Sequence, residues 1–219
     1  MIIVAGGSGT RMGVATPKQF LELDGKPILM RTLERLHSID TAMQLVLVLP
    51  KDQIPTWNQL RSKHGFRIEV ELAEGGATRF LSVKSGLSKV SDADVVGVHD
   101  GVRPFVSATV IDECFQKANE FGAAVPAVPV VQSLRKVDSN ENKGVDRNIF
   151  RAIQTPQCFK YSILEQAYSS AKGVDYSDDA SVVEETGVKI QICDGNEENI
   201  KITSPLDLEL AQLIISRPN

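Results

Sequence analysis

The segment from Ala5 to Gly13 combines glycines with a cation in a pattern suited to binding phosphate. It has the sequence Ala-Gly-Gly-Ser-Gly-Thr-Arg-Met-Gly and follows a short apolar run. Closely spaced glycines let backbone N–H groups approach and surround a phosphate chain. Arg11 within the segment and Lys18 shortly after it supply positive charge. The pattern predicts a cradle for nucleotide phosphates, although a glycine cluster occurring alone would fit a surface turn equally well.

Two better-known phosphate loops do not fit this segment. A Walker A motif would close with Gly-Lys followed by Ser or Thr, whereas Met12-Gly13-Val14 stands at that point. The spacing of Gly7, Gly9 and Gly13 resembles a dinucleotide-binding loop. However, no acidic residue ends a second strand about 20 residues further on, where a ribose would need it.

A second segment, from His99 to Pro104, ends another apolar run and has the sequence His-Asp-Gly-Val-Arg-Pro. The carboxylate of Asp100 is positioned to hold Mg²⁺ on nucleotide phosphates, because hard cations prefer oxygen ligands. Arg103 would then meet a second anion. Since Asp-Gly is a common turn dipeptide, the residues alone also allow a plain turn after a strand. His99 is expected to be packed or hydrogen-bonded.

The composition argues against several other classes of protein. The chain has 219 residues, with 24 Lys and Arg against 28 Asp and Glu, and a formal net charge of -4. Proteins that bind nucleic acid or membrane surfaces need a basic field, so neither partner is expected. The three cysteines lie far apart and leave one over, which fits neither a disulfide framework nor a zinc site. With no apolar stretch of about 18 residues and no sign of export, a cytoplasmic location is expected.

Alternating strand-like and helix-like segments must position these residues. Continuous apolar runs predict buried strands, and apolar residues three or four apart predict helices. Strands are expected at 2–5, 45–49, 68–72, 95–99, 188–193 and 199–202, and helices at 28–36, 78–87, 108–121, 161–171 and 205–215. Ser107 and Ser204 are the expected N-caps of two of these helices. The alternation predicts an α/β fold with a doubly wound, mostly parallel sheet of Rossmann-like nucleotide-binding topology, in a single domain spanning residues 1–219.

Residues 128–154 interrupt this alternation. Two extended stretches, 130–138 and 145–153, flank a turn-forming cluster that ends in Gly144. We interpret the insertion as a β-hairpin arm. Because an isolated two-stranded hairpin is marginally stable in water, the arm is expected to pack against a second copy of the chain, which predicts a homodimer.

Several motifs, taken together and in order, resemble one enzyme family. They are AGGSGTRM followed by PKQF, then GGATRFLSV, VHDGVRPF, VDRNIF, TPQCF, SDDAS and NIKITSPLDL. This set, which spans almost the whole chain, resembles the 2-C-methyl-D-erythritol 4-phosphate cytidylyltransferase family of the non-mevalonate isoprenoid pathway. The resemblance implies an enzyme that joins CTP to this polyol phosphate, releases pyrophosphate and uses Mg²⁺ or another divalent cation.

The resemblance also implies a role for each matching residue. The cytosine nucleotide would be held by Ala5, Gly6, Gly7, Gly76, Ala77 and Ser82, with Gly101 against the ribose. Asp100 would hold Mg²⁺. The polyol-phosphate pocket would comprise Arg103, Ser133, Arg147, Ser177, Asp178 and Lys201, with Ser133 and Arg147 contributed by the arm of a partner subunit. The residues acting on the reacting phosphates would be Arg11, Lys18, Lys201 and Arg147.

Three positions depart from the family's usual residues. Ser133 and Ser177 stand where the family commonly has threonine, and Gly101 stands where it commonly has alanine. The hydroxyl groups remain, so activity is still expected. Without the resemblance, the segment around Lys201 would also fit an edge strand with an outward lysine.

The residue types agree with nucleotidyl transfer, which needs no protein nucleophile. The substrate phosphate attacks the α-phosphate in line, and catalysis consists of positioning and charge stabilisation. Two alternatives remain at this point: the same reaction on ribitol 5-phosphate, and a catalytically silent nucleotide-binding relative. Val145-Asp146-Arg147 resembles the erythritol-phosphate enzymes, and the charged residues at the expected reacting centre argue against the silent relative.

Overall fold

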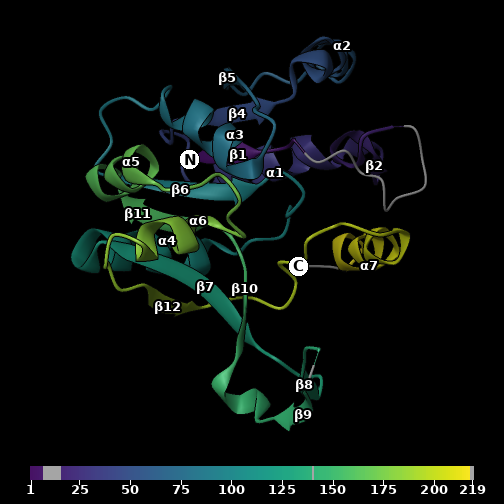
Figure 1. Cartoon of the computed structure of the whole chain (residues 1–219). Coiled ribbons are helices and arrows are strands. Elements are labelled where there is room, and N and C mark those ends of the chain that lie inside the picture. Colours follow the sequence, from purple (N-terminus) through teal and green to yellow (C-terminus); the bar gives the residue numbers. More distant parts are fainter. Residues whose placement is uncertain (7–15, 140, 218–219) are drawn as a thin grey trace.

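The computed structural model describes residues 1–6, 16–139 and 141–217 (Figure 1). The strands are β1 (Ile2–Val4), β2 (Glu22–Leu23), β3 (Lys26–Pro27), β4 (Val46–Leu49), β5 (Glu71–Glu74), β6 (Val95–Asp100), β7 (Ala123–Pro129), β8 (Leu134–Val137), β9 (Asn142–Val145), β10 (Arg151–Ile153), β11 (Gln157–Lys160) and β12 (Gln191–Asp194). The helices are α1 (Ile28–Ile39), α2 (Ile54–Lys63), α3 (Arg79–Leu87), α4 (Ala108–Phe121), α5 (Tyr161–Ser170), α6 (Asp179–Glu184) and α7 (Pro205–Ile215). No helix in these described ranges has the length and apolar character needed to cross a bilayer.

An eight-stranded mixed sheet forms the centre of the described chain. Its order is β10-β7-β11-β6-β1-β4-β5, and β12 also pairs with β7. The strands β6, β1, β4 and β5 run parallel, whereas β11 is antiparallel to both of its neighbours. The prediction of an α/β fold with a mostly parallel sheet is confirmed.

Successive residues of the central strands point to opposite faces of this sheet and enter different cores. Ile3 and Leu47 pack on the face covered by α1, α2 and α4. Ile2 and Val46 pack on the face covered by α3, α5 and α6. Because both faces are buried, β1 and β4 are apolar at every position and β6 is apolar up to His99, which is the pattern that made these strands predictable.

Serine caps fix the beginnings of two helices. The Ser107 hydroxyl accepts a hydrogen bond from the Val110 amide at 3.2 Å, and α4 begins at the next residue. Ser204 forms a capping box with Asp207 at the beginning of α7. Both caps and both helix ranges agree with the sequence prediction.

Residues 199–202 do not form the predicted strand. The Asn199 side-chain amide donates to the Thr155 carbonyl at 2.8 Å, and the Ile202 amide donates to the Val102 carbonyl at 3.1 Å. The alternation of apolar residues does not reflect a strand here. Ile200 and Ile202 instead pack in a small core with Ala211 of α7. The segment is an irregular chain held by side chains and isolated backbone bonds.

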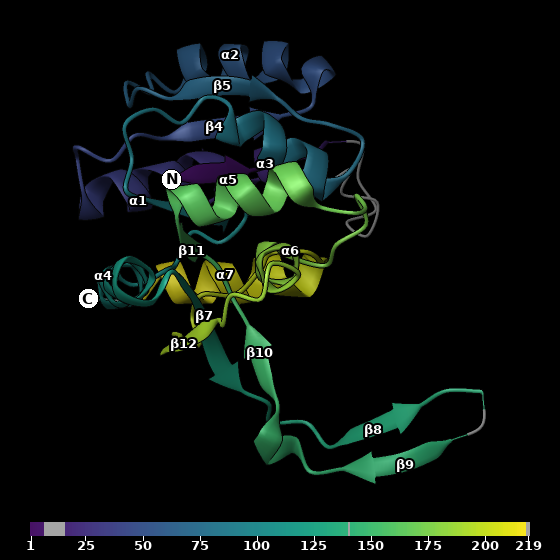
Figure 2. The same ribbon diagram turned by 60° about the vertical axis from the view of Figure 1, so that its left-hand side comes forward.

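Between β7 and β10, the strands β8 and β9 extend away from the body of the molecule (Figures 1 and 2). Leu134 of β8 pairs with Val145 of β9. The predicted second stretch, 145–153, is not one strand, because a 3₁₀ turn at Arg147–Ile149 separates β9 from β10. β10 then rejoins the main sheet by pairing with β7. The turn between the two strands is also shorter than predicted. The predicted turn ends at Gly144, whereas β9 already begins at Asn142.

Candidate active site

The carboxyl ends of the parallel strands border a cavity of about 240 Å³. β1 leads into Ala5, β6 ends at Asp100, and β5 leads into the Gly76 loop. Ligands in open α/β sheets bind at this edge. The lining includes eight of the sequence-predicted residues: Ala5, Gly6, Lys18, Gly76, Ala77, Ser82, Asp100 and Lys201. Gly7 and Arg11 lie outside the described residues.

A network around Ser82 shapes the Gly76 loop. The Gly76 amide donates to the Ser82 hydroxyl at 3.1 Å, and that hydroxyl donates to the Thr78 carbonyl at 2.9 Å. A Cβ at Gly76 would lie 2.4 Å from the Cβ of Leu81, so the loop can approach α3 only with glycine there. Ser82 therefore holds the loop that borders the cavity.

Lys18 reaches the cavity from the 3₁₀ turn Lys18–Phe20. The next residue, Gln19, is fully buried, and its side-chain amide donates to the Ala5 carbonyl at 2.7 Å. This bond ties the turn to the end of β1. Lys18 is thus carried on a segment that is anchored to the sheet edge.

Two cations pair with the carboxylate of Asp100. Arg103 Nε lies 3.0 Å and Lys201 Nζ 3.1 Å from the same Asp100 oxygen, Oδ2. Burial alone would raise the pKa of Asp100, but the charges of Lys201, Arg103 and Arg79 outweigh burial and hold its pKa well below the usual range. The carboxylate is therefore ionised at neutral pH and can bind cations.

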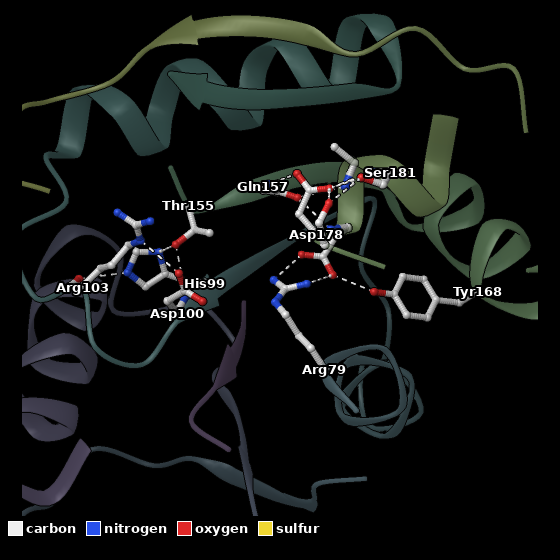
Figure 3. Close-up of polar contacts among 12 residues, drawn as sticks. Arg79, His99, Asp100, Arg103, Thr155, Gln157, Tyr168, Asp178 and Ser181 are labelled. Carbon is white, nitrogen blue, oxygen red and sulfur yellow. Dashed lines mark hydrogen bonds and ion pairs between the residues drawn. The ribbon is translucent and has the colours of Figure 1, made fainter. Parts of the chain in front are cut away.

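His99 lies beside Asp100 and contacts both Arg103 and Thr155 (Figure 3). Thr155 Oγ1 accepts from the Asp100 amide at 3.1 Å and lies 3.0 Å from His99 Nδ1. His99 Nε2 lies 3.0 Å from the Arg103 carbonyl, which can only accept. Nε2 must therefore carry the proton, and Nδ1 accepts from Thr155. The prediction of a packed, hydrogen-bonded histidine is confirmed.

Burial should make His99 a source of acid sensitivity in folding. Desolvation lowers its pKa from 6.5 to about 4, so the unfolded chain binds a proton that the folded chain excludes. Stability should fall as pH decreases from about 6.5 to 4, by at most about 3 kcal/mol from this group. We expect His99→Gln to flatten the dependence of the thermal unfolding midpoint on pH in that window. Equal slopes for both proteins between pH 7 and 5 would contradict this expectation.

A second cavity of about 130 Å³ adjoins the same cluster. It is lined by the sequence-predicted Arg103, Ser177, Asp178 and Lys201, together with Arg79, Asp100, Ile153, Gln154, Thr155 and Gln157. Arg79, Asp100 and Lys201 border both cavities. Two ligands could therefore meet at these three side chains.

Three predicted residues do not line either described cavity. Ser133 and Arg147 are exposed on the arm, where Arg147 donates a hydrogen bond to the Val131 carbonyl. Gly101 packs in the interior instead, since a Cβ there would lie 2.9 Å from the Cβ of Ala5 and 3.1 Å from Leu29 Cδ1. A side chain at this position would therefore require Ala5 or Leu29 to shift.

Sequence reasoning missed Arg79, Thr155 and Gln157. Thr155 and Gln157 lie in the TPQCF motif and Arg79 in GGATRFLSV, so the motifs contained them, but the residue types alone indicated no role. Gln157 accepts from the Asp179 and Ala180 amides at 3.0 and 2.9 Å and donates to Asp178 at 2.9 Å. It orients the beginning of α6 beside the second cavity.

A larger and more open groove, of about 860 Å³, lies near the beginnings of β4 and β5. Its lining includes His37, Arg61 and Glu69. None of the described sequence-predicted residues borders it, and it lies at the opposite end of the strands from Asp100. Size alone therefore does not identify the reactive site.

Comparison with known sequences gives matches along the whole chain. The family described as IspD, 2-C-methyl-D-erythritol 4-phosphate cytidylyltransferase, matches residues 1–217. A Bacteroides fragilis protein named 2-C-methyl-D-erythritol 4-phosphate cytidylyltransferase is 49% identical over 214 residues, which cover 98% of both chains. A Bacteroides thetaiotaomicron protein of the same name is 47% identical over 215 residues, again covering 98% of both chains.

Solved structures of similarly named proteins share the fold. The Thermus thermophilus 2-C-methyl-D-erythritol 4-phosphate cytidylyltransferase superposes with a TM-score of 0.81 at 33% identity, over 97% of each chain. The Anaerococcus prevotii 4-diphosphocytidyl-2C-methyl-D-erythritol synthase superposes with a TM-score of 0.83 at 25% identity. That match covers 99% of this chain and 97% of the other.

Proposed function

The chain belongs to the 2-C-methyl-D-erythritol 4-phosphate cytidylyltransferase family, and on that premise we propose how its two cavities serve the reaction. It is a nucleotidyltransferase of the non-mevalonate isoprenoid pathway. The enzyme joins CTP and 2-C-methyl-D-erythritol 4-phosphate and releases pyrophosphate. The observation that carries the proposal is that Asp100 and Lys201 border both cavities, where an attacking phosphate and an α-phosphate could meet.

The larger of these two cavities holds CTP. Its backbone-rich wall at Ala5, Gly6, Gly76 and Ala77 suits recognition of a flat base, and Ser82 fixes the loop that carries Gly76. Lys18 faces the triphosphate and stabilises charge that develops at the α-phosphorus. Gly7 and Arg11 belong to the same phosphate-binding segment, while Gly101 supports the ribose side by packing against Ala5.

Asp100 provides the protein ligand for Mg²⁺. Both neighbouring cations contact Oδ2, and Oδ1 has no hydrogen bond to a described residue. An ionised carboxylate with a spare oxygen fits a cation that takes its remaining ligands from phosphates and water. No group of three His, Cys, Asp or Glu side chains in the described ranges could hold a metal. When bound, Mg²⁺ would neutralise phosphate charge; other divalent cations could substitute.

Asp100→Asn should raise the Mg²⁺ concentration for half-maximal activity by about tenfold, because an amide is a poorer ligand for a hard cation. The measurement is a Mg²⁺ titration of pyrophosphate release at fixed substrate concentrations. Asp112→Asn, at an exposed carboxylate on α4, is the matched control and should leave the titration unchanged. A wild-type titration curve for Asp100→Asn would exclude a direct metal role.

The smaller cavity holds the polyol phosphate. Arg103 and Lys201 supply positive charge for its phosphate, and Ser177 and Asp178 offer groups that can hydrogen-bond its hydroxyls. Arg103 is held in place by Asp100 and by the Asn199 carbonyl, which accepts from it at 2.7 Å. The phosphate is thereby positioned beside the nucleotide cavity for in-line attack.

The arm completes the smaller cavity of a second copy, so the enzyme is a homodimer. Large apolar side chains are exposed on the arm, with Val131, Val137 and Ile149 at 69%, 70% and 76%. Such exposure favours burial against another chain. Ser133 and Arg147 border no described cavity of their own chain, which supports a role in the partner's site.

Residues 1–219 form one nucleotidyltransferase domain, and 128–154 form the dimerisation arm inserted within it. A cytoplasmic location is supported by Cys114, Cys158 and Cys193, all buried and free. CTP and the polyol phosphate are its partners, with no nucleic acid or membrane among them.

A parallel assay of two acceptors tests the proposed function. Purified protein, CTP and Mg²⁺ are incubated with 2-C-methyl-D-erythritol 4-phosphate or ribitol 5-phosphate, and pyrophosphate release is followed. The similar proteins are named for the erythritol compound, so kcat/KM should be at least about a hundredfold higher with it than with ribitol 5-phosphate. Equal or greater turnover of ribitol 5-phosphate would contradict the proposal.

A further inference from the structure

Arg79 lies where the two cavities meet. It is the first residue of α3 and directly follows the nucleotide-side loop Gly76–Thr78. Its side chain borders both cavities and is 25% exposed. An arginine at such a junction could bind a substrate directly or hold the two walls together.

The guanidinium is committed to another side chain. Arg79 donates two hydrogen bonds to Asp179, with Nη1–Oδ1 at 2.8 Å and Nη2–Oδ2 at 2.6 Å. The Asp179 side chain is fully buried, and Tyr168 donates to its Oδ1 at 2.6 Å (Figure 3). A bidentate pair fixes direction as well as distance, which a single contact would not.

A second contact joins α3 to α5. The ring of Phe80, the next residue of α3, stacks on Tyr168 of α5 with centroids 4.6 Å apart and planes 9° apart. The beginning of α3 is therefore fastened to α5 by aromatic packing and to α6 by the ion pair. The ion pair ends at Asp179, which directly follows the cavity-lining Asp178 in the chain.

Asp179 follows Ser177 and Asp178 directly, and these two residues line that cavity. The side chain of Asp178 caps α6 by accepting from the Ser181 amide at 3.0 Å. Asp179 is the first residue of α6. A shift of its carboxylate would therefore move the wall formed by Ser177 and Asp178.

We propose that Arg79 is a positioning residue, and that its ion pair with Asp179 fixes the polyol-phosphate wall at Ser177–Asp178 relative to the nucleotide loop at Gly76–Thr78. This inference rests on the proposed assignment of the two cavities. It makes Arg79 act on the second substrate through Asp179, without touching that substrate. The pair sets the separation of the two reacting phosphates, which in-line transfer requires to be close to the productive geometry.

Two variants break the bidentate pair while limiting the risk of unfolding. Arg79→Lys keeps a cation beside the buried Asp179 but loses the planar fork. Asp179→Asn removes the charge and leaves Arg79, which is partly exposed, with access to water. Each should lower kcat/KM for 2-C-methyl-D-erythritol 4-phosphate by at least about tenfold, mainly through KM, while KM for CTP changes by less than about threefold.

Tyr168→Phe is the matched control, because it removes a hydrogen bond from the same carboxylate but leaves the ion pair and the ring stacking. It should lower the thermal unfolding midpoint and leave both KM values within about twofold of wild type. Unfolding midpoints of all three variants show that the kinetics are measured on folded protein.

Three outcomes would overturn the proposal. An equal rise of both KM values in Arg79→Lys would mean that Arg79 binds the nucleotide directly. An equally large rise of the polyol-phosphate KM in Tyr168→Phe would mean that any weakening of contacts around Asp179 produces the effect, so the ion pair has no specific role. Unchanged kinetics in Arg79→Lys and Asp179→Asn would mean that the pair positions nothing. If wild-type protein released no pyrophosphate, the proposed function would fail instead, and the two failures are thus distinguishable.

Discussion

Replacing Lys18 with alanine is expected to lower kcat by about a hundredfold or more at saturating CTP, because removing one preorganised charge stabiliser costs a few kcal/mol in the transition state. Lys18 borders the nucleotide cavity together with Asp100 and Lys201. Its turn is anchored to the sheet through the buried Gln19, so the backbone that carries the lysine is held in place before substrate binds. The measurement is steady-state pyrophosphate release with both substrates saturating.

Lys51→Ala is the matched control for this variant. Lys51 is exposed, forms a surface ion pair with Glu74 at 3.6 Å and does not border the cavity. It should leave kcat unchanged and keep the wild-type unfolding midpoint, since exposed ion pairs contribute little to stability. Near-normal turnover of Lys18→Ala would show that this lysine does not stabilise charge at the α-phosphorus.

Mixed dimers should recover activity that two separate variants lack. Arg147→Ala is expected to lower kcat/KM for the polyol phosphate at least about a hundredfold, with little change in KM for CTP, because the guanidinium meets only the second substrate. Lys18→Ala lacks activity because its own nucleotide cavity is impaired, whereas its arm is intact. In a mixed dimer, one site combines the intact body of the first chain with the intact arm of the second.

The size of the recovery follows from twofold symmetry. Random reassociation of equal amounts makes about half of the dimers mixed, each with one competent site, so about a quarter of wild-type activity should return. Arg135→Ala, on the same arm, replaces Arg147→Ala as a control and should be active without mixing. A monomer by sedimentation at assay concentration, or no recovery in verified mixed dimers, would show that the arm does not complete the partner's site.

The sequence predicts the strands that are buried on both faces and the helices that have one clear apolar face. β1, β4 and β6 are buried on both faces and therefore appear as continuous apolar runs. α4 has both a clear apolar face and a serine cap. By contrast, α2 buries only Trp57 among its residues, so its apolar period is weak and the helix was not predicted.

Other features depend on contacts that no local pattern contains. The segment at 199–202 alternates like a strand, but its isoleucines pack beside α7 and its backbone is held by Arg103 and Val102. The pairing of Arg79 with Asp179 joins residues 100 positions apart. The motifs contained most of the cavity-lining residues, whereas their division into two cavities that share Arg79, Asp100 and Lys201 required the three-dimensional arrangement.

The stereochemical course at the α-phosphorus tests the central claim most directly. That claim is direct in-line transfer between two ligands that meet at Asp100 and Lys201, with no covalent enzyme intermediate. The substrate is one diastereomer of CTP with sulfur in place of a non-bridging α-oxygen, and the configuration of the cytidylylated polyol is determined by phosphorus NMR. A single displacement predicts inversion. Retention would require two displacements through a covalent intermediate and would contradict the mechanism.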